Sequence, residues 1–334
     1  MKNSHKLIIV ISLVVLALGL ATATIFTKEE EKGNTATIKV RYAAPLTIAA
    51  APVYVADAMG FWNEEGIDVD VTYFDSGRKA LDALLSDSAE VMSVSETPPL
   101  RSYLSGSEIN IIATVTKHKE AKMTVRSDKI TKPEDVKGKK LGTVAGTNSD
   151  YYMYRWLEAN GIKKDEVEII PLDATALSQA FVQGNVDVMF AWEPHNYNAS
   201  SKIATMSKSW PTELYSGRHT IVMSSDYLKN NPAAAERVIK GFIKAESYIK
   251  NSPDDAKKIV IDRTGMSKDA LDKLWGEYDY TVGLDDELAK IIKDQSSWIS
   301  ASQNDDPSVD LNGFVNSAHL LQIESARVGK TYKP

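Results

Sequence analysis

The sequence predicts an α/β fold built from two lobes of similar plan. From residue 38 onward, short strand-like runs alternate with segments of helical periodicity, the order expected of βαβ units around a largely parallel sheet. This order occurs twice along the chain. The 334 residues, 43% of them hydrophobic, are enough for two domains with sizeable cores.

The first lobe begins with a strand expected over residues 38–43. A loop with two prolines follows, and then a helix that ends near Gly60. A second strand is expected over 69–74. Ser76 can cap the next helix, whose leucines fall on one face, and a strand over 90–94 closes the unit.

The second lobe repeats this order. A strand over 140–144 leads through a polar turn into a helix that Gly161 ends, and a later helix is ended by Gly184. The run 186–192 then predicts a buried strand. The C-terminal part of the chain is helical and includes residues 232–251.

Two stretches of sequence resemble each other and support this duplication. They read ALLSDSAEVMSVSETP and AFVQGNVDVMFAWEP. Each contains a helix end, an acidic residue before a strand, and a glutamate followed shortly by a proline. The two stretches are expected to occupy matching places in the two lobes.

Two extended runs bracket the second lobe and are candidate hinge strands. They are TVRSD over 124–128 and VMSSD over 222–226. If the chain crosses between the lobes at these runs, residues 38–125 and 226–330 form lobe 1. Residues 126–225 then form lobe 2.

The N-terminal residues 1–26 form either a signal peptide or a membrane anchor. Lys2 and Lys6 precede an uncharged run that ends at residue 26. Residues 21–23 resemble a cleavage site, but a run of about 20 apolar residues is also long enough to span a bilayer, so both alternatives stay open. In either case the polar linker 27–37 and everything after it are delivered outside the cytoplasm, to the periplasm or the cell surface.

Composition excludes several classes of function. The net charge of −6 argues against a nucleic-acid partner, and the absence of cysteine excludes disulfides, thiolate metal sites and a lipid-modified cysteine. No common catalytic motif is present, and the five histidines are scattered, so we expect neither catalytic residues, nor a metal, nor a cofactor. His219 is expected to be structural, and the protein to be a monomer.

Three loop-to-helix turns, over 45–52, 75–78 and 145–150, could present backbone amides to an anion. Helix capping alone explains any one of them. Their recurrence after strands in both lobes favours a ligand site, because open α/β sheets bind ligands beyond the carboxyl ends of their strands. Trp192 is either an apolar wall of that site or a core residue, and Glu193 follows it.

Four longer motifs give the chain a resemblance to a known family. They are PVYVADAMGFWNEEGIDVDV, YFDSGRKALDALLSDSAEV, KPEDVKGKKLGTVAGTNSDYYMYRWLEANGI and QGNVDVMFAWEP. The chain resembles substrate-binding proteins of the nitrate, sulfonate and taurine class, which are SsuA/THI5-like and related to binders of thiamine-pyrimidine precursors. The resemblance runs from about residue 38 to about residue 329.

This resemblance implies a type II periplasmic-binding-protein-like clamshell, with two lobes joined by two hinge strands. It implies a small ligand between the lobes and delivery to an ABC permease with its ATPase subunit. The ligand-binding residues it implies are Thr47, Ala49, Ala50, Ser76, Gly77, Ser95, Glu96, Thr97, Thr147, Asn148, Ser149, Trp192 and Glu193.

The ligand implied is a small anion or zwitterion, with an aliphatic sulfonate or taurine favoured. Nitrate, bicarbonate and pyrimidine precursors stay open. Glu96 departs from the family pattern, which often has a small residue there. A carboxylate in the pocket would oppose a simple anion and favour an amine, unless the Glu96 side chain points away.

Two alternatives remain. A sensor could use the same clamp to report a solute to a membrane partner. An enzyme of pyrimidine-precursor metabolism is disfavoured, because the related enzymes use a cysteine-rich cluster and this chain has no cysteine. An enzyme would need two titratable groups that converge in the cleft, and Glu96 with Glu193 is the only such pair that the sequence offers. The expected mechanism is ligand-dependent hinge closure without chemistry.

Overall fold

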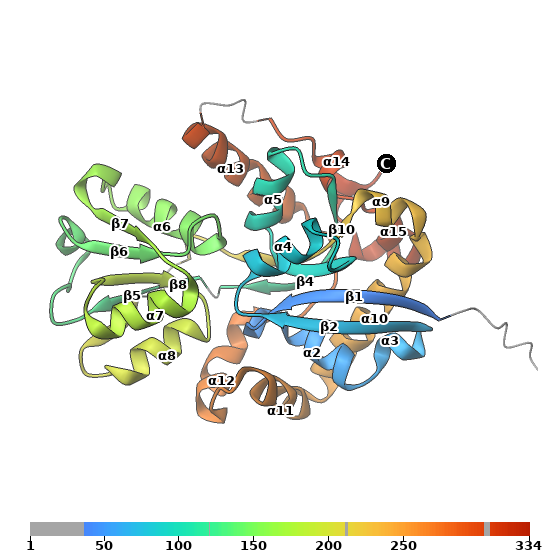
Figure 1. Ribbon diagram of the computed structural model, residues 1–334, viewed down its shortest axis with the longest axis horizontal. Coiled ribbons are helices and arrows are strands. Elements are labelled where there is room, and N and C mark those ends of the chain that lie inside the picture. The colour runs from blue at the N-terminus through green and yellow to red at the C-terminus, as the bar shows by residue number, and fades with distance from the viewer. Residues whose placement is uncertain (1–36, 120, 211–212, 304–307) are drawn as a thin grey trace, which may run out of the picture. The chain divides into compact units, whose positions relative to one another are not determined.

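The computed structural model describes residues 37–119, 121–210, 213–303 and 308–334, and its strands form two sheets (Figure 1). The predicted signal or anchor and the linker up to residue 36 lie outside the described residues. Among the residues that are described, no helix is long and apolar enough to cross a membrane.

The first sheet has the strand order β11-β4-β10-β3-β1-β2. Its strands are β1 (Ile38–Pro45), β2 (Ile67–Phe74), β3 (Val91–Ser95), β4 (Ile109–His118), β10 (Gly217–Ser224) and β11 (Tyr278–Asp279). Strands β2, β1 and β3 are parallel, whereas β10 runs antiparallel to both β3 and β4. We call this sheet and the helices packed on it the first lobe.

The second sheet has the order β7-β6-β8-β5-β9. Its strands are β5 (Lys122–Arg126), β6 (Lys140–Thr143), β7 (Glu168–Pro171), β8 (Val188–Ala191) and β9 (Ser207–Trp210). Here β7, β6 and β8 are parallel, and β5 runs antiparallel to β8 and β9. We call this sheet and its helices the second lobe.

Helices from two separate parts of the chain belong to the first lobe. They are α2 (Ala51–Ala58), α3 (Phe61–Glu64), α4 (Gly77–Leu85), α5 (Thr97–Leu104), α9 (Ser225–Asn230), α10 (Pro232–Asn251), α11 (Pro253–Thr264), α12 (Lys268–Leu274), α13 (Asp286–Gln303), α14 (Leu311–Phe314) and α15 (Ala318–Glu324). The long α10 packs against α2 and α3, so the C-terminal helices complete the core that the N-terminal strands begin.

Three helices cover the two faces of the second sheet (Figure 1). They are α6 (Asn148–Ala159), α7 (Ala174–Gln183) and α8 (His195–Lys202). On one face Trp156 of α6 packs near Phe190, and on the other Leu177 and Phe181 of α7 share a core with Met189. Alternate residues of β8 therefore enter different cores, as the period of two requires.

The local predictions are largely confirmed. Ser76 accepts a hydrogen bond from the amide of Lys79 and caps α4. Gly184 ends α7 in the left-handed conformation, with φ of 80°, and α10 spans the predicted residues. The predicted run 186–192 is buried, but the strand β8 within it is shorter, from Val188 to Ala191.

The predicted hinge strands are wrong. Residues 124–126 lie in β5, which is hydrogen-bonded on both sides within the second sheet, and residues 222–224 lie in β10 of the first sheet. The chain instead passes between the sheets after β4 and before β10. The division into lobes stays a prediction, and the sheets place its two crossings earlier than residues 126 and 225.

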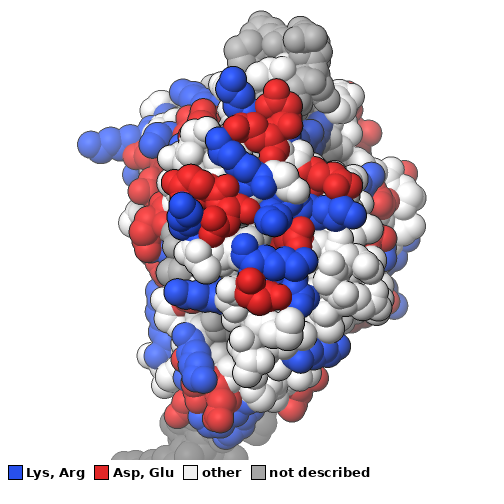
Figure 2. Space-filling view, turned by 90° about the vertical axis from the view of Figure 1, so that its left-hand side faces the viewer, with Lys and Arg blue, Asp and Glu red and all other residues white. Residues whose placement is uncertain are grey.

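Charge is dispersed on the face that carries the second lobe. Figure 2 shows lysine and arginine side chains interspersed with aspartate and glutamate over this face. Several of these residues pair with each other, including Lys137 with Glu166 at 2.7 Å. This face offers no continuous basic surface of the kind that binds nucleic-acid backbones.

Candidate functional site

A small buried cavity lies where strand ends of the two sheets meet. Its volume is about 20 Å³, which is room for about one water molecule. Residues from both lobes line it: Pro45, Thr47, Gly77, Val94, Ser95, Pro98, Thr147, Asn148, Trp192 and His219. This is the position at which open α/β sheets hold ligands.

The first-lobe wall is built by the turns that follow β1, β2 and β3. The amide of Thr47 donates to the Tyr54 hydroxyl at 2.9 Å, which fixes the turn after β1. Gly77 begins α4 directly against β3, where a Cβ atom would stand 2.2 Å from Cγ2 of Val94. Only glycine lets the start of α4 approach this closely, so the backbone itself forms part of the wall.

The second-lobe wall is the turn between β6 and α6. The Thr147 hydroxyl donates to the carbonyl of Val144 at 2.7 Å, and the Asp150 carboxylate accepts from the amide of Gly146 at 3.0 Å. These bonds hold Asn148 at the first position of α6, where it is 4% exposed. Its side-chain nitrogen Nδ2 has no hydrogen-bond partner among the described residues.

Trp192 supplies an apolar surface to the same cavity. It follows β8 directly and is 5% exposed, and its indole meets the His195 ring edge to face at 5.5 Å. Val94 and the prolines of the first-lobe wall add apolar surface from the other lobe. Trp192 is thus both a core residue and a wall residue.

One hydrogen bond joins the two walls directly. The Thr47 hydroxyl of the first lobe donates to the backbone carbonyl of Glu193 in the second lobe at 3.1 Å. A second contact between the lobes is made by Tyr151 of α6, which packs on Trp298 of α13 with ring centroids 5.3 Å apart. The lobes are therefore in contact around the cavity.

Glu96 points away from this cavity. Its carboxylate accepts hydrogen bonds from the Tyr215 hydroxyl, from the amide of Arg218 at 2.8 Å and from Nε2 of Gln295 at 2.6 Å. Burial raises the pKa of the Glu96 carboxyl, and these donors oppose the rise. Glu96 anchors the end of β3 inside the first lobe.

The buried Glu193 carboxylate also binds groups outside the cavity lining. The carboxylate accepts from the amide of Tyr197 at 2.9 Å and lies 3.4 Å from Nζ of Lys122. Burial raises the pKa of Glu193, and the charge of Lys122 opposes the rise. The enzyme alternative would need Glu96 and Glu193 to converge in the cleft, and they do not: Glu96 is bound by Tyr215, Arg218 and Gln295, and Glu193 by Tyr197 and Lys122.

Six of the predicted ligand residues line the cavity: Thr47, Gly77, Ser95, Thr147, Asn148 and Trp192. The other seven are not among its lining residues: Ala49, Ala50, Ser76, Glu96, Thr97, Ser149 and Glu193. Ala49 and Ala50 are buried in a 3₁₀ turn, Ser76 caps α4, and the Ser149 hydroxyl lies 3.0 Å from that of Thr147. Thr97 is buried at the start of α5.

His219 is the residue that the sequence prediction missed. It lies in β10 opposite Ser95 of β3, is 1% exposed, and lines the cavity. Burial lowers the pKa of His219 to about 3, so the ring is neutral near pH 7. In the sequence, His219 is one residue of a buried strand, and only the pairing of β10 with β3 shows that it lies beside Ser95.

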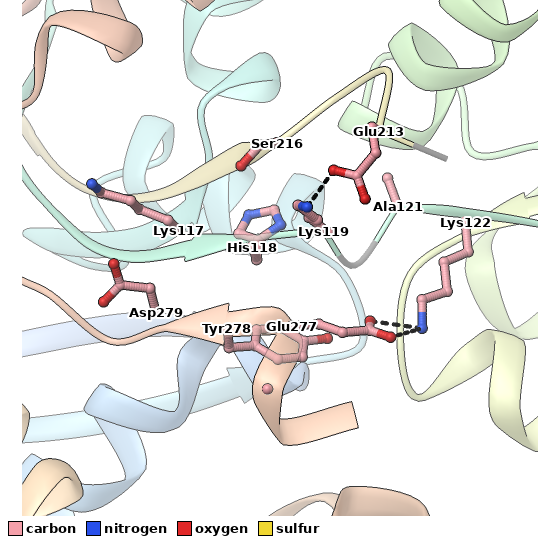
Figure 3. A pocket seen from close by; sticks show the side chains of 11 residues that line it. Lys117, His118, Lys119, Ala121, Lys122, Glu213, Ser216, Glu277, Tyr278 and Asp279 are labelled. Carbon is pink, nitrogen blue, oxygen red and sulfur yellow. Dashed lines mark hydrogen bonds and ion pairs between the residues drawn. The ribbon is translucent and has the colours of Figure 1, made fainter. Parts of the chain in front are cut away.

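A larger pocket, of about 440 Å³, lies where the chain crosses between the sheets (Figure 3). Its lysines are matched by acids: Lys119 pairs with Glu213, and Lys122 with Glu277 at 2.7 Å. Lys117 pairs with Asp285 at 3.1 Å. These cations already have partners, so we assign the ligand site to the smaller cavity, whose walls hold unpaired polar groups.

The described part of the chain has no group of three or more histidine, aspartate or glutamate side chains that could hold a metal ion.

Sequence comparison places the chain in a family. The model of the family described as NMT1/THI5 like matches residues 47–256, and the chain belongs to this family. Over 216 residues it is 28% identical to the taurine-binding periplasmic protein of Escherichia coli (strain K12), a match that covers 62% of this chain and 65% of that protein.

Solved structures share the fold. The alkanesulfonate-binding protein SsuA from Xanthomonas axonopodis pv. citri bound to MOPS matches with a TM-score of 0.74 and 16% identity, over 85% of this chain and 99% of that one. The periplasmic aliphatic sulphonate binding protein SsuA from Escherichia coli matches with a TM-score of 0.70 and 18% identity, over 82% and 96%. The fold is therefore that of periplasmic binding proteins, as predicted.

The same fold also carries catalysis. The desulfurization enzyme DSZB matches with a TM-score of 0.64 and 16% identity, over 86% of this chain and 99% of that one. The fold alone does not distinguish a binding protein from an enzyme, so the distinction has to be argued from the residues of the site.

Proposed function

We propose that this chain is the extracytoplasmic solute-binding component of an ABC importer and that it holds an alkanesulfonate-like anion in the cavity between the lobes. The observation that carries the proposal is the cavity itself. It lies at the strand ends of two sheets, and both lobes supply polar groups and apolar surface to it.

The walls suit an anion held by neutral donors. No lining residue carries an ionised side chain, and Gly77 and Asn148 are the first residues of helices α4 and α6. The hydroxyls of Thr47 and Thr147 already donate to backbone carbonyls, so the free side-chain donor of this turn is Nδ2 of Asn148. Helix starts favour negative charge, and hydrogen bonds to a charged group are stronger than neutral ones. A sulfonate head group can accept from several such donors at once.

The same walls disfavour an ammonium group. Neither Glu96 nor Glu193 directs its carboxylate into the cavity, so nothing there compensates the desolvation of a cation. We therefore infer an alkanesulfonate in preference to the zwitterion taurine. Trp192, Val94 and the prolines would cover its aliphatic part.

The mechanism is closure of the lobes on the ligand. A cavity with room for one water does not accommodate a sulfonate, so entry requires the lobes to move apart, and the bound ligand then keeps them slightly wider than here. Closure is favoured by the extra contacts that the ligand gains from the second wall. The permease with its ATPase is the proposed partner.

The test is a ligand screen by thermal shift and calorimetry on the full chain in a non-ionic detergent. Tris replaces sulfonate buffers such as MOPS, because these would compete. Pentanesulfonate at 100 times its dissociation constant should stabilise the protein by roughly 2.7 kcal/mol. Taurine should bind at least about tenfold more weakly, since its ammonium finds no partner.

The matched ligand control is pentanoate, which keeps the tail and the charge but changes the head group. Equal binding of pentanoate would move the ligand class to carboxylates, and a preference for taurine would contradict the neutral-wall argument. A response to none of the sulfonates would remove the proposal.

A further inference from the structure

His219 is a buried polar side chain whose two ring nitrogens are both unpaired. Neither Nδ1 nor Nε2 has a hydrogen-bond partner among the residues that the structure describes, although His219 is 1% exposed. Buried polar side chains in folded proteins almost always have partners, and an unpaired one weakens the fold. This imidazole therefore lacks a structural explanation.

The position of His219 beside the cavity explains why its ring nitrogens are unpaired. Strand β10 is inserted antiparallel beside β3, and His219 is paired in register with Ser95, which lines the same cavity. The neighbouring charged residue Arg218 is directed elsewhere, to Asp285 at 3.0 Å and to Glu287 at 2.5 Å. No carboxylate fixes the tautomer of the ring, so either nitrogen can carry the proton.

A second unpaired group faces the cavity from the other lobe. Nδ2 of Asn148 also lacks a partner, at 4% exposure. Two buried donors without acceptors thus line one cavity from opposite sides. A ligand with two or more acceptor oxygens would satisfy both donors, and only while the lobes are closed.

We propose that His219 is a ligand-contacting, specificity-determining residue, whose neutral ring donates an N–H to one oxygen of the bound anion while Asn148 donates to another. This inference rests on the proposed function. It assigns the discrimination of a multi-oxygen head group to a pair of uncharged donors, one on each lobe.

The experiment measures the affinity of the full chain for pentanesulfonate by calorimetry in Tris, together with the melting temperature of the ligand-free protein. The variants are His219→Leu, which removes the donor, and His219→Gln, which restores one. The matched control is His319→Leu, on α15 and outside the residues that line the cavity.

We expect His219→Leu to weaken binding roughly 10- to 100-fold, the loss of one hydrogen bond to a charged group. His219→Gln should recover most of that loss, and His319→Leu should leave affinity unchanged. The ligand-free His219→Leu protein should melt at the same or a higher temperature, because an unpaired polar group has been removed. A purely structural histidine would show the opposite pattern.

Three results would overturn the inference. If His219→Leu binds within threefold of the wild type, His219 does not contact the ligand, and the proposed function stands without it. If both His219 variants lose affinity and also melt lower, the role of His219 is structural. If the wild type binds no sulfonate, the proposed function and this inference fail together.

Discussion

The two lobes have the same strand order, but the glutamate that follows the third strand, β3 or β8, has different partners in each lobe. Each sheet begins with three parallel strands, followed by one antiparallel strand and then a fifth strand. The order is β2-β1-β3-β10-β4 in the first lobe and β7-β6-β8-β5-β9 in the second. Glu96 follows β3 and is held by uncharged donors, whereas Glu193 follows β8 and faces a lysine.

The acidic residues that precede the same two strands, β3 and β8, make equivalent hydrogen bonds in the two lobes. Glu90 and Asp187 stand just before β3 and β8, and each accepts from the backbone amide of the adjacent first strand, at 2.7 Å from Arg41 and 3.1 Å from Lys140. The acid before the strand is thus used identically in both lobes. The acid after the strand is used differently, but in both cases it stays out of the cavity.

The largest expected effect separates the two glutamates. Glu96→Ala leaves three buried donors unpaired and should lower the free energy of unfolding by about 3 to 5 kcal/mol. Glu193→Ala should lower it by about 1 to 2 kcal/mol, because Lys122 keeps Glu277. Urea unfolding of both variants measures this, and an equal loss would contradict the contrast between the lobes.

The next test compares two tightly packed glycines. A Cβ at Gly77 would stand 2.2 Å from Val94, and one at Gly142 would stand 2.2 Å from Leu177. Each Gly→Ala variant should be destabilised by about 1 to 3 kcal/mol through overpacking. Only Gly77→Ala should also weaken ligand binding, since Val94 lines the cavity. Calorimetry that found both affinities unchanged would argue against this wall.

A third prediction concerns the part of the acid sensitivity that His219 gives to the first lobe. The pKa of His219 is about 3 in the folded protein against about 6.5 when unfolded, so the unfolded chain takes up the proton first. Stability is complete above pH 6.5 and falls as the pH drops below it, by about 1.4 kcal/mol between pH 7.5 and 5.5.

The measurement is urea unfolding at those two pH values, with hydrogen exchange to locate the change. His219→Leu should remove this part of the pH dependence, leaving that of His118 and that of His195 in the second lobe, whose pKa values burial also lowers. Exchange that rises first in the second lobe would place the sensitivity elsewhere.

The smallest expected effect tests the shared acid. Glu90→Gln and Asp187→Asn keep an acceptor for the backbone amide but remove the ion pairs with Arg41 and Lys129. Both should lower the free energy of unfolding by about 0.5 to 1 kcal/mol, as expected for partly exposed pairs. A difference above about 2 kcal/mol between them, measured by calorimetry, would show that the two positions are not equivalent.

The sequence was sufficient where local rules decide. Ser76 capping, the left-handed glycine after α7 and the periodicity of α10 each depend on a few neighbouring residues, and these predictions are confirmed. The duplicated stretches were recognisable because β3 and β8 occupy matching places in their sheets.

The remaining features depend on contacts between distant segments. The hinge prediction failed because an extended run looks the same whether it crosses between lobes or enters a sheet, as residues 124–126 do. The direction of Glu96 is set by Tyr215 and Gln295, which lie over 100 residues away in sequence. His219 was missed because its place beside Ser95 follows from the insertion of β10.

The insertion of β10 also fixes an order of assembly. The second sheet is continuous in sequence from β5 to β9, so all its strands emerge together during synthesis. In the first sheet β10 separates β3 from β4, and β4 therefore has no place in the sheet until residue 224 has been made. The first lobe therefore starts to be synthesised before the second lobe and is completed after it. Until β10 has been synthesised, the edge of β3 that β10 will cover is unpaired.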